Sequence, residues 1–334
     1  MQKKRVTIKD VAREAGVSAM AVSQALNHRG RLSAETRERI LQVADSLGYV
    51  PNNIAKSLRV SETRTIGVVV SDCSQILMAK ILKGIEDVAS HHGYSVIISN
   101  TNADKEAERQ SIATLMNQRI DGLILTAPLN TSLEDMQTLR NFGIPFVILM
   151  RRTTADFVDF ITNDNIAGGY EIARHLLEKE VRPLKFIALP SYSTSGVERM
   201  QGYQKAMKEF GVPMKKEDVL SSRPYIEDGF AAMNRLLDKG MTSGAVCCGS
   251  DLIAIGAIDA ILKRGLRVPE DIQVSGYDDI DFLDYFRIPL TTMRQPQYEI
   301  GQTGANILIE KLQNPSAPIK QIILKSQLIV RESC

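Results

Sequence analysis

Two short amphipathic patterns open the chain. Thr7 and Asp10 have the spacing of a capping box and predict a helix that Gly16 ends. Ser18 stands where it can cap a second helix over residues 19–26. Two helices joined by a tight, glycine-containing turn within about 20 residues are typical of a helix-turn-helix. In that motif the second helix enters the DNA major groove, so the pattern favours a DNA-binding headpiece over a plain helical domain.

A third helix and a short linking segment follow. The pattern predicts a helix that begins after Ser33 and ends at Gly48, and Pro51 prevents its continuation. Residues 51–60 also have helical spacing, but an isolated helix in water needs about 12–15 residues. This segment is either an interdomain linker or a hinge helix that folds on DNA and inserts an apolar side chain into the minor groove.

From residue 65 onward, short apolar runs alternate with helical patterns. One series occupies residues 65–70, 94–98, 122–125 and 145–149, and a second occupies residues 184–189, 245–248 and 272–275. Such runs predict parallel strands buried on both faces, and the two series predict two doubly wound α/β subdomains with a ligand cleft between them. The expected organisation is a headpiece (1–50), a hinge (51–64) and a body (65–334), with subdomains near 65–163 and 164–290 and crossovers near 290–334.

The distribution of charge along the chain indicates a binding partner. The chain has 334 residues, of which 44% are hydrophobic and 24% charged, so it is expected to be a soluble globular protein. The net charge is only +2, but residues 1–64 hold 12 basic and 6 acidic residues, whereas the remainder holds 29 and 33. A basic head on a mildly acidic body indicates a polyanionic partner for the head alone.

The sequence gives little support for a secreted, membrane-spanning, metal-binding or catalytic protein. No secretory signal or long apolar run is present, so we expect a cytoplasmic protein whose cysteines are reduced and lie in or near a core. The adjacent Cys247 and Cys248 lack zinc-site spacing, and the chain has no G-x-G-x-x-G, no phosphate-binding loop and no catalytic set. We therefore expect no metal, no cofactor and no enzymatic activity.

Several strings resemble a known family. Residues 6–18 read VTIKDVAREAGVS and residues 21–27 read AVSQALN, and both closely resemble the headpiece of the lactose/galactose repressor (LacI/GalR) family. The strings RMQGY at 199–203 and GYDD at 276–279 resemble its periplasmic-binding-protein-like effector domain, with a framework nearest the purine-repressor branch. The resemblance implies a transcriptional regulator, most often a repressor, that acts on the nucleoid and responds to a small-molecule effector, such as a sugar or sugar derivative.

The resemblance also implies roles in DNA binding. Leu58 falls at the position of the family's intercalating leucine, and Ala19, Met20 and Gln24 fall at positions that read bases in the major groove. Many relatives have arginine in place of Gln24. Because glutamine pairs with adenine and arginine with guanine, we expect a different operator half-site here. The other candidate DNA contacts are Thr7, Ser18, Ser23, Asn27, Arg31, Asn53, Ile54, Lys56 and Arg59.

In the body, the resemblance assigns effector contacts to Arg199 and Asp278. A guanidinium and a carboxylate across a cleft can hold vicinal hydroxyl groups. The other candidate effector residues are Gln75, Met78, Arg151, Ser193, Ser195 and Ser250. Relatives often carry an aromatic residue in the stretch that is Gln75–Met78 here, so stacking on a purine or a sugar face is not expected. Arg151 beside Arg199 favours an acidic sugar or a phosphate.

The sequence leaves two alternatives open. One is a soluble sugar-binding protein without DNA function, against which the basic head and the missing signal argue. The other is a cytosolic sugar-metabolising enzyme, against which the missing phosphate-binding loop and catalytic set argue. Family members that form tetramers add a C-terminal leucine heptad segment, and residues 327–334 contain no repeated heptads. We therefore expect a homodimer in which the effector changes the spacing of the two hinges and hence the affinity for operator DNA.

Overall fold

The structure is a computed structural model that describes residues 6–26, 30–49, 62–126 and 132–334. The chain divides into two units, residues 1–63 (the headpiece) and residues 64–334 (the body). None of the helices in the described segments has the length and hydropathy needed to cross a bilayer. The segment predicted as a hinge, with Asn53, Ile54, Lys56, Leu58 and Arg59, lies outside the described residues, and so does Asn27.

The headpiece contains the predicted helices α1 (Ile8–Glu14), α2 (Ala19–Leu26) and α3 (Ala34–Ser46). The Asp10 carboxylate accepts a 2.9 Å hydrogen bond from the Thr7 backbone N–H, and Ser18 Oγ accepts one of 3.1 Å from the Ala21 N–H. Ser33 Oγ caps α3 in the same way. Small apolar side chains from the three helices form one core, which consists of Val11, Ala12, Ala15, Val22, Ala25, Ile40 and Ala44. The predicted helix-turn-helix headpiece is confirmed.

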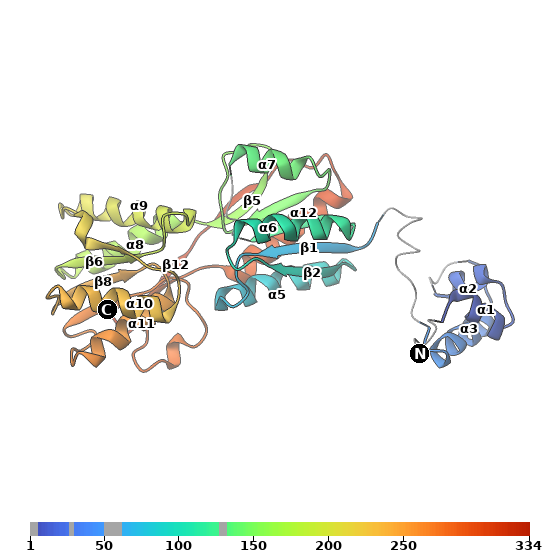
Figure 1. The fold of residues 1–334 in the computed structure, drawn as a ribbon, viewed down its shortest axis with the longest axis horizontal. Helices are drawn as coiled ribbons and strands as arrows, with labels where there is room; N and C mark the ends of the chain where they lie inside the picture. The colour runs from blue at the N-terminus through green and yellow to red at the C-terminus, as the bar shows by residue number, and fades with distance from the viewer. Residues whose placement is uncertain (1–5, 27–29, 50–61, 127–131) are drawn as a thin grey trace. The chain divides into compact units, whose positions relative to one another are not determined.

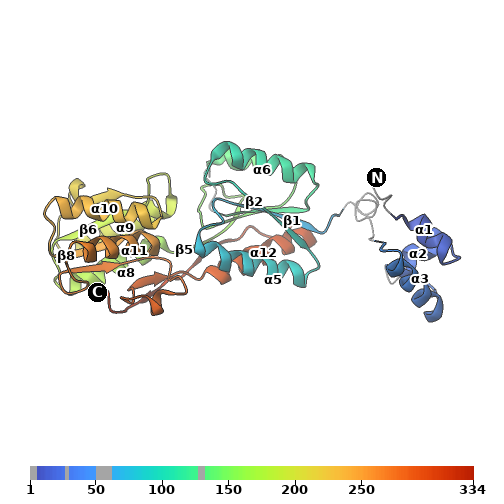
Figure 2. The same ribbon diagram turned by 60° about the horizontal axis from the view of Figure 1, so that its bottom comes forward.

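In the first subdomain of the body, described strands form a sheet in the order β11-β5-β4-β3-β1-β2, with all neighbours parallel. The strands are β1 (Thr65–Val70), β2 (Ser95–Asn100), β3 (Gly122–Thr126), β4 (Phe146–Leu149), β5 (Asp159–Asn163) and β11 (Gln321–Leu324). The helices are α5 (Ile76–His91), α6 (Lys105–Asn117), α7 (Leu133–Arg140) and α12 (Gln297–Gln313). Helix α6 covers one face of the sheet, and α5 and α12 cover the other (Figures 1 and 2).

In the second subdomain, described strands form a parallel sheet in the order β7-β6-β8-β9, and β10 pairs with β12 in an antiparallel ribbon. The strands are β6 (Leu184–Ala188), β7 (Val219–Ser221), β8 (Gly244–Cys248), β9 (Ile272–Ser275), β10 (Thr292–Arg294) and β12 (Gln327–Ile329). The helices are α8 (Asn165–Glu178), α9 (Thr194–Glu209), α10 (Ile226–Asp238) and α11 (Asp251–Lys263), with short 3-10 turns η1 (Lys216–Asp218) and η2 (Leu283–Tyr285). The predicted pair of doubly wound subdomains is confirmed.

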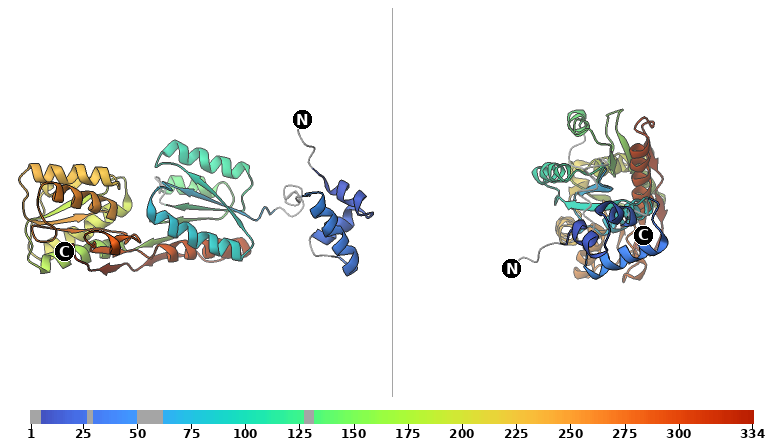
Figure 3. Two further views of the ribbon diagram at one scale, coloured as in Figure 1. Left: turned by 90° about the horizontal axis from the view of Figure 1, so that it is seen from below. Right: turned by 90° about the vertical axis from the view of Figure 1, so that its right-hand side faces the viewer.

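The chain passes between the subdomains near Asp164, Gln295 and Ser326, where β5 leads into α8, β10 into α12, and β11 into β12. Figure 3 shows these connecting segments running beside one another along one side of the body. Because α12 and β11 return to the first subdomain after the second is built, each subdomain contains distant parts of the sequence. The carboxyl ends of the first and second sheets therefore face a common region, where open α/β sheets bind their ligands.

Pairs of helices in the body approach closely at glycines. A Cβ atom built on Gly84 of α5 would overlap the carbonyl oxygen of Tyr298, and one on Gly301 of α12 would overlap that of Ile81. The α8–α9 pair meets in the same way at Gly169 and Gly202, and the α10–α11 pair at Gly229 and Gly256. Since real Cβ atoms do not make such contacts, these crossings require glycine.

The structure departs from the sequence prediction at some strands and one cysteine. We expected residues 94–98 to be buried on both faces, but β2 is an edge strand and the Ile98 side chain is 50% exposed. The apolar pattern does not predict β5 because Asp159, Thr162 and Asn163 interrupt it, yet all residues of this strand are buried. Nor does it predict β7, β10, β11 or β12. The expectation that the cysteines lie in or near a core is wrong for Cys73, which is exposed.

Candidate functional site

The first candidate site is the surface of α2 in the headpiece. Met20 is 72% exposed at its first turn, and Arg31 is exposed beyond its end. Ala19, Ser23 and Gln24 are half-buried. The hydroxyls of Thr7 and Ser18 are engaged at the starts of α1 and α2, which places both residues at helix N-termini, where backbone N–H groups favour a phosphate.

Gln24 packs against the loop that follows α2. Its Cδ and Oε1 atoms would each lie 2.6 Å from a Cβ atom built on Gly30, which has a φ angle of +79°. A side chain at residue 30 would therefore collide with Gln24, and the left-handed backbone conformation also favours glycine there. The glycine leaves room for the glutamine side chain at the position that was predicted to read a base.

The second candidate site is a cavity of about 320 Å³ between the two subdomains. The first subdomain contributes residues that follow β1, β2 and β4, and the second contributes residues that follow β6, β7, β8, β9 and β10. The structure brings together all eight residues predicted to bind an effector, namely Gln75, Met78, Arg151, Ser193, Ser195, Arg199, Ser250 and Asp278. Gln75 is half-buried and the others are buried, so the cavity walls are made by well-packed side chains.

Arg199 is fixed from several sides. Its side chain is 4% exposed, its Nε donates a 3.1 Å hydrogen bond to Asn165 Oδ1, and its Nη1 donates one of 2.5 Å to the Gly249 carbonyl oxygen. The guanidinium carbon lies 3.6 Å from the centre of the Tyr277 ring, a cation–π contact. Nη2 lies 3.7 Å from Asp278 Oδ1. The guanidinium is thus held rigidly beside the cavity.

Asp278 connects the cavity to a crossover segment. Gln295 Nε2 donates a hydrogen bond to Asp278 Oδ1, and Gln297 Nε2 donates one of 2.8 Å to its backbone oxygen. The φ angle of Asp278 is +127°, and Asn102, Ala103 and Met150 on the cavity wall also have positive φ. Residues in such rare conformations cost energy and often occur where function requires a fixed geometry.

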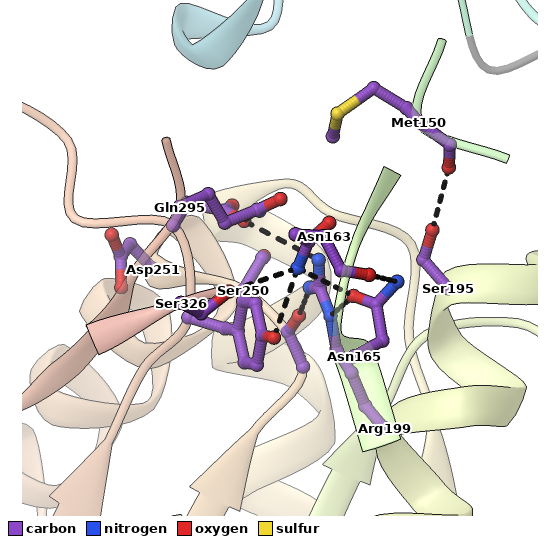
Figure 4. A network of polar contacts seen from close by, with 12 residues as sticks. Met150, Asn163, Asn165, Ser195, Arg199, Ser250, Asp251, Gln295 and Ser326 are labelled. Atoms are coloured by element: carbon purple, nitrogen blue, oxygen red, sulfur yellow. Dashed lines mark hydrogen bonds and ion pairs between the residues drawn. The ribbon is translucent and has the colours of Figure 1, made fainter. Parts of the chain in front are cut away.

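A polar network joins the other crossover segments (Figure 4). Asn163 Nδ2 at the end of β5 donates hydrogen bonds to Asn165 Oδ1 (3.1 Å), Tyr277 OH (3.2 Å) and Ser326 Oγ (3.2 Å). Asn165 in turn accepts from Arg199. The effector candidates Arg199 and Asp278 are therefore bonded, directly or through one neighbour, to the described segments at which the chain passes between subdomains.

Buried carboxylates lie behind this network. Burial raises the pKa of Asp251 to about 7, and the nearby charge of Asp278 adds to the effect. Burial also raises the pKa of Asp278, although the Arg199 guanidinium and the Gln295 hydrogen bond oppose the rise. Asp251 also fixes the surrounding chain, because it accepts hydrogen bonds from Thr292 Oγ1 (2.5 Å) and the Ile280 N–H (3.1 Å).

The serines predicted to line the cavity already have structural partners. Ser193 Oγ accepts a 3.2 Å hydrogen bond from the Gly196 N–H at the start of α9, and Ser250 Oγ accepts one of 3.3 Å from the Ile253 N–H at the start of α11. Ser195 Oγ donates a 3.2 Å hydrogen bond to the Met150 carbonyl oxygen, across the subdomain boundary. These hydroxyls therefore position the helix starts that form this part of the cavity wall.

Sequence reasoning missed several wall residues, among them Asp72, Asn102, Tyr192, Arg223, Tyr225 and Gln295. No motif marked them, because they lie in loops whose approach depends on the tertiary fold. Tyr192 and Tyr225 line the cavity, whereas the stretch Gln75–Met78 has no ring. The opposite subdomain therefore supplies aromatic rings that the stretch Gln75–Met78 lacks.

Comparison with known proteins finds relatives of both the headpiece and the body. Residues 7–52 match the family described as bacterial regulatory proteins, lacI family, and residues 63–332 match the periplasmic binding proteins and sugar binding domain of the LacI family. The chain is 34% identical to the HTH-type transcriptional repressor PurR of Haemophilus influenzae (strain PittEE) and 32% identical to the ribose operon repressor of Haemophilus influenzae (strain ATCC 51907 / DSM 11121 / KW20 / Rd). Each alignment covers 98% of both chains.

Among solved structures, the Lac repressor dimer bound to operator and the anti-inducer ONPF has a TM-score of 0.89 to this chain. That alignment covers 99% of each chain at 28% identity. The similarity thus extends over headpiece and body, and the two sequence relatives named above are both repressors. The chain therefore belongs to the lacI family of bacterial regulatory proteins.

Proposed function

We propose that this protein is a homodimeric repressor that acts in the bacterial cytoplasm and binds operator DNA through its headpieces. A small-molecule effector changes its affinity for that DNA. The observation that carries the proposal is the cavity between the subdomains, where Arg199 and Asp278 stand beside each other and are bonded to the crossover segments. A ligand held there contacts both subdomains and so favours one arrangement of them over another.

On the DNA side, the proposal assigns base reading to Ala19, Met20 and Gln24. The exposed Met20 supplies apolar contact with a thymine methyl group, and Gln24 supplies paired hydrogen bonds to an adenine. Ser23, Asn27, Arg31 and the N-terminal groups of Thr7 and Ser18 position the headpiece on the phosphates. Asn53, Ile54, Lys56, Leu58 and Arg59 act in the minor groove, with Leu58 as the inserted wedge.

On the effector side, the proposal assigns hydroxyl recognition to Arg199 and Asp278 and the remaining contacts to Gln75, Met78, Arg151, Ser193, Ser195 and Ser250. The cavity is near the lower end of the range of about 300–1,000 Å³ seen for small-molecule sites, which suits a single sugar or sugar derivative. Coupling to DNA follows from Gln295 and Asn163, which transmit a change at the cavity to the segments that connect the subdomains.

The test has two steps. A thermal unfolding screen of sugars, sugar acids and sugar phosphates identifies a compound that raises the melting temperature of the full chain, because a ligand selective for the folded state stabilises it. The affinity for an operator obtained by in vitro selection is then measured with and without that compound. We expect a change of about 5- to 150-fold, the usual range of allosteric coupling.

Two matched variants test whether the ligand response depends on the cavity. Asp278→Asn should abolish the ligand response while operator binding without ligand persists. Asp259→Asn, at a side chain of α11 that is 48% exposed, should leave both unchanged. A ligand that binds in the cavity of the wild-type protein without altering operator affinity would contradict the proposed effector role.

A further inference from the structure

Arg151 is a buried cation for which no ion pair is found within the described part of the chain. The residue follows β4, lines the cavity and is only 8% exposed. Its Nη1 donates hydrogen bonds to the hydroxyl oxygens of Thr194 (2.9 Å) and Ser193 (3.4 Å), while its Nε has no hydrogen-bond partner among the described residues. No Asp or Glu in the described part of the chain forms an ion pair with it. Burying a charge without a direct ion pair in this way is costly.

The surroundings make that position still more electropositive. Ser193 and Thr194 are the N-cap and first residue of α9, so the guanidinium lies at the positive end of a helix dipole. Burial, together with the charge of Arg199 in the same cavity, lowers the pKa of Arg151 to about 10, and the charges of Glu198 and Glu108 offset only part of this effect. An anion placed directly on the guanidinium would offset the remainder.

The next residue, Arg152, differs from Arg151 because it forms an ion pair. Arg152 Nε lies 3.0 Å from Glu198 Oε1, and Arg152 does not line the cavity. The carboxylates that do line it already have partners: Asp278 is bonded to Gln295, and Asp72 accepts hydrogen bonds from Ser74 and Tyr225. The carboxylates of the cavity wall are therefore engaged elsewhere, and a ligand in the cavity can supply the negative group that would pair with Arg151.

We propose that the effector of this protein is an anion: a small polyhydroxylated molecule whose carboxylate or phosphate binds Arg151 and the first turn of α9, while its hydroxyls bind Arg199 and Asp278. The inference rests on the proposed function only in taking this cavity as the effector site. Guanidinium forks bind carboxylates and phosphates through paired, charge-assisted hydrogen bonds, and the free N–H groups of a helix N-terminus favour the same ligands.

The experiment compares matched ligands on the full chain at constant ionic strength. Inorganic phosphate, aldonates, uronates and sugar phosphates are tested by thermal unfolding beside the neutral parent sugar of each. Wild type, Arg151→Gln and Arg152→Gln are measured together, and the affinity of any ligand found is determined by calorimetry. Because these measurements use no DNA, the inference can fail while operator binding succeeds, and the reverse.

We expect at least one sugar acid or sugar phosphate to raise the wild-type melting temperature by about 5 °C at a hundredfold excess over its Kd, with little effect of its neutral parent. Acids and phosphates in the panel separate the two sources of negative charge. Arg151→Gln should bind that ligand about 10- to 100-fold more weakly, whereas Arg152→Gln should bind it normally.

The unliganded Arg151→Gln protein gives a second readout. Because Arg151 is buried without its anion in this state, removing its charge should leave the melting temperature equal to or above that of the wild type. A lower value would indicate that Arg151 only ties the subdomains together, and would overturn the inference. A neutral sugar that binds better than its acid or phosphate, a panel in which no anion binds, or unchanged binding by Arg151→Gln would each overturn it too.

Discussion

The Tyr225 hydroxyl donates a 2.9 Å hydrogen bond to Asp72 Oδ2, and this bond joins the two subdomains across the cavity. Asp72 follows β1 in the first subdomain, whereas Tyr225 precedes α10 in the second. Burial opposes ionisation of Asp72, but hydrogen bonds from Ser74, Tyr225 and Gln75 outweigh it and lower its pKa. The carboxylate is therefore charged at neutral pH and accepts the bond strongly.

Removing that hydroxyl should weaken ligand binding. In Tyr225→Phe the subdomains lose one bond that holds them around the ligand, so we expect the affinity for the ligand found by thermal screening to fall about 2- to 10-fold. Isothermal titration calorimetry measures the change. Tyr170→Phe is the matched control, because it removes a 3.0 Å bond to Glu209 within the second subdomain. Equal losses in both variants would argue against a role for the Tyr225–Asp72 bond.

The elements whose signals are local could be predicted from the sequence. In the headpiece, Thr7, Ser18, Ser33 and Gly48 act within one turn of their own helices, so capping and termination are readable without knowledge of the fold. The central strands β1, β3, β6 and β8 are mostly apolar because both faces are covered. The cavity residues came from the family resemblance, since they lie on segments far apart in the sequence.

What escaped prediction depends on tertiary contacts. Asp159, Thr162 and Asn163 break the apolar pattern of β5, but Asp159 forms an ion pair with Lys311 and Asn163 bonds to other crossover segments. Nothing in the local sequence marks Tyr225 as the partner of Asp72. The burial of Arg151 could not be read from the sequence either, because it follows from the approach of the start of α9 to the end of β4.

Close helix crossing makes a prediction about stability. Gly301→Ala places a methyl group against the Ile81 carbonyl oxygen, so α12 must move away from α5. Overpacking of this kind costs about 1–3 kcal/mol, which urea denaturation of the full chain should report as a lower midpoint. Gln302→Ala is the matched control, because the next residue of the same helix is exposed and loses only side-chain atoms. An unchanged midpoint for Gly301→Ala would contradict the packing described.

Asp251 predicts a pH dependence of stability. Its pKa is raised from 3.8 to about 7, so between these values the folded protein holds a proton that the unfolded chain releases. That contribution to stability is complete below about pH 4 and is lost as the pH rises to about 7. Titration of Asp251 should therefore lower the melting temperature as the pH rises through this window.

The variant Asp251→Asn isolates this group. Its amide oxygen can accept from the Ile280 N–H, its amide nitrogen can donate to Thr292 Oγ1, and it does not titrate. Calorimetric unfolding from about pH 5 to about pH 8 should show a weaker pH dependence than in the wild type. An identical pH profile for both proteins would contradict the assignment to Asp251.

Gln24 makes a prediction about operator sequence. Glutamine forms paired hydrogen bonds with adenine N6 and N7, whereas arginine prefers guanine O6 and N7. In a selection from randomised duplexes, Gln24→Arg should change the preferred base at one position of each half-site. The remaining positions should keep their preferences, because Ala19 and Met20 are unaltered. An unchanged base preference would show that Gln24 does not read that position.

The most direct test of the account is a gel shift of the full chain on a selected palindromic operator and on a scrambled duplex, repeated across a salt series. The account predicts preference for the operator by at least about 10³-fold, and a steep loss of affinity with salt as headpiece cations release counterions from the phosphates. Equal affinity for the two duplexes at every salt concentration would contradict it.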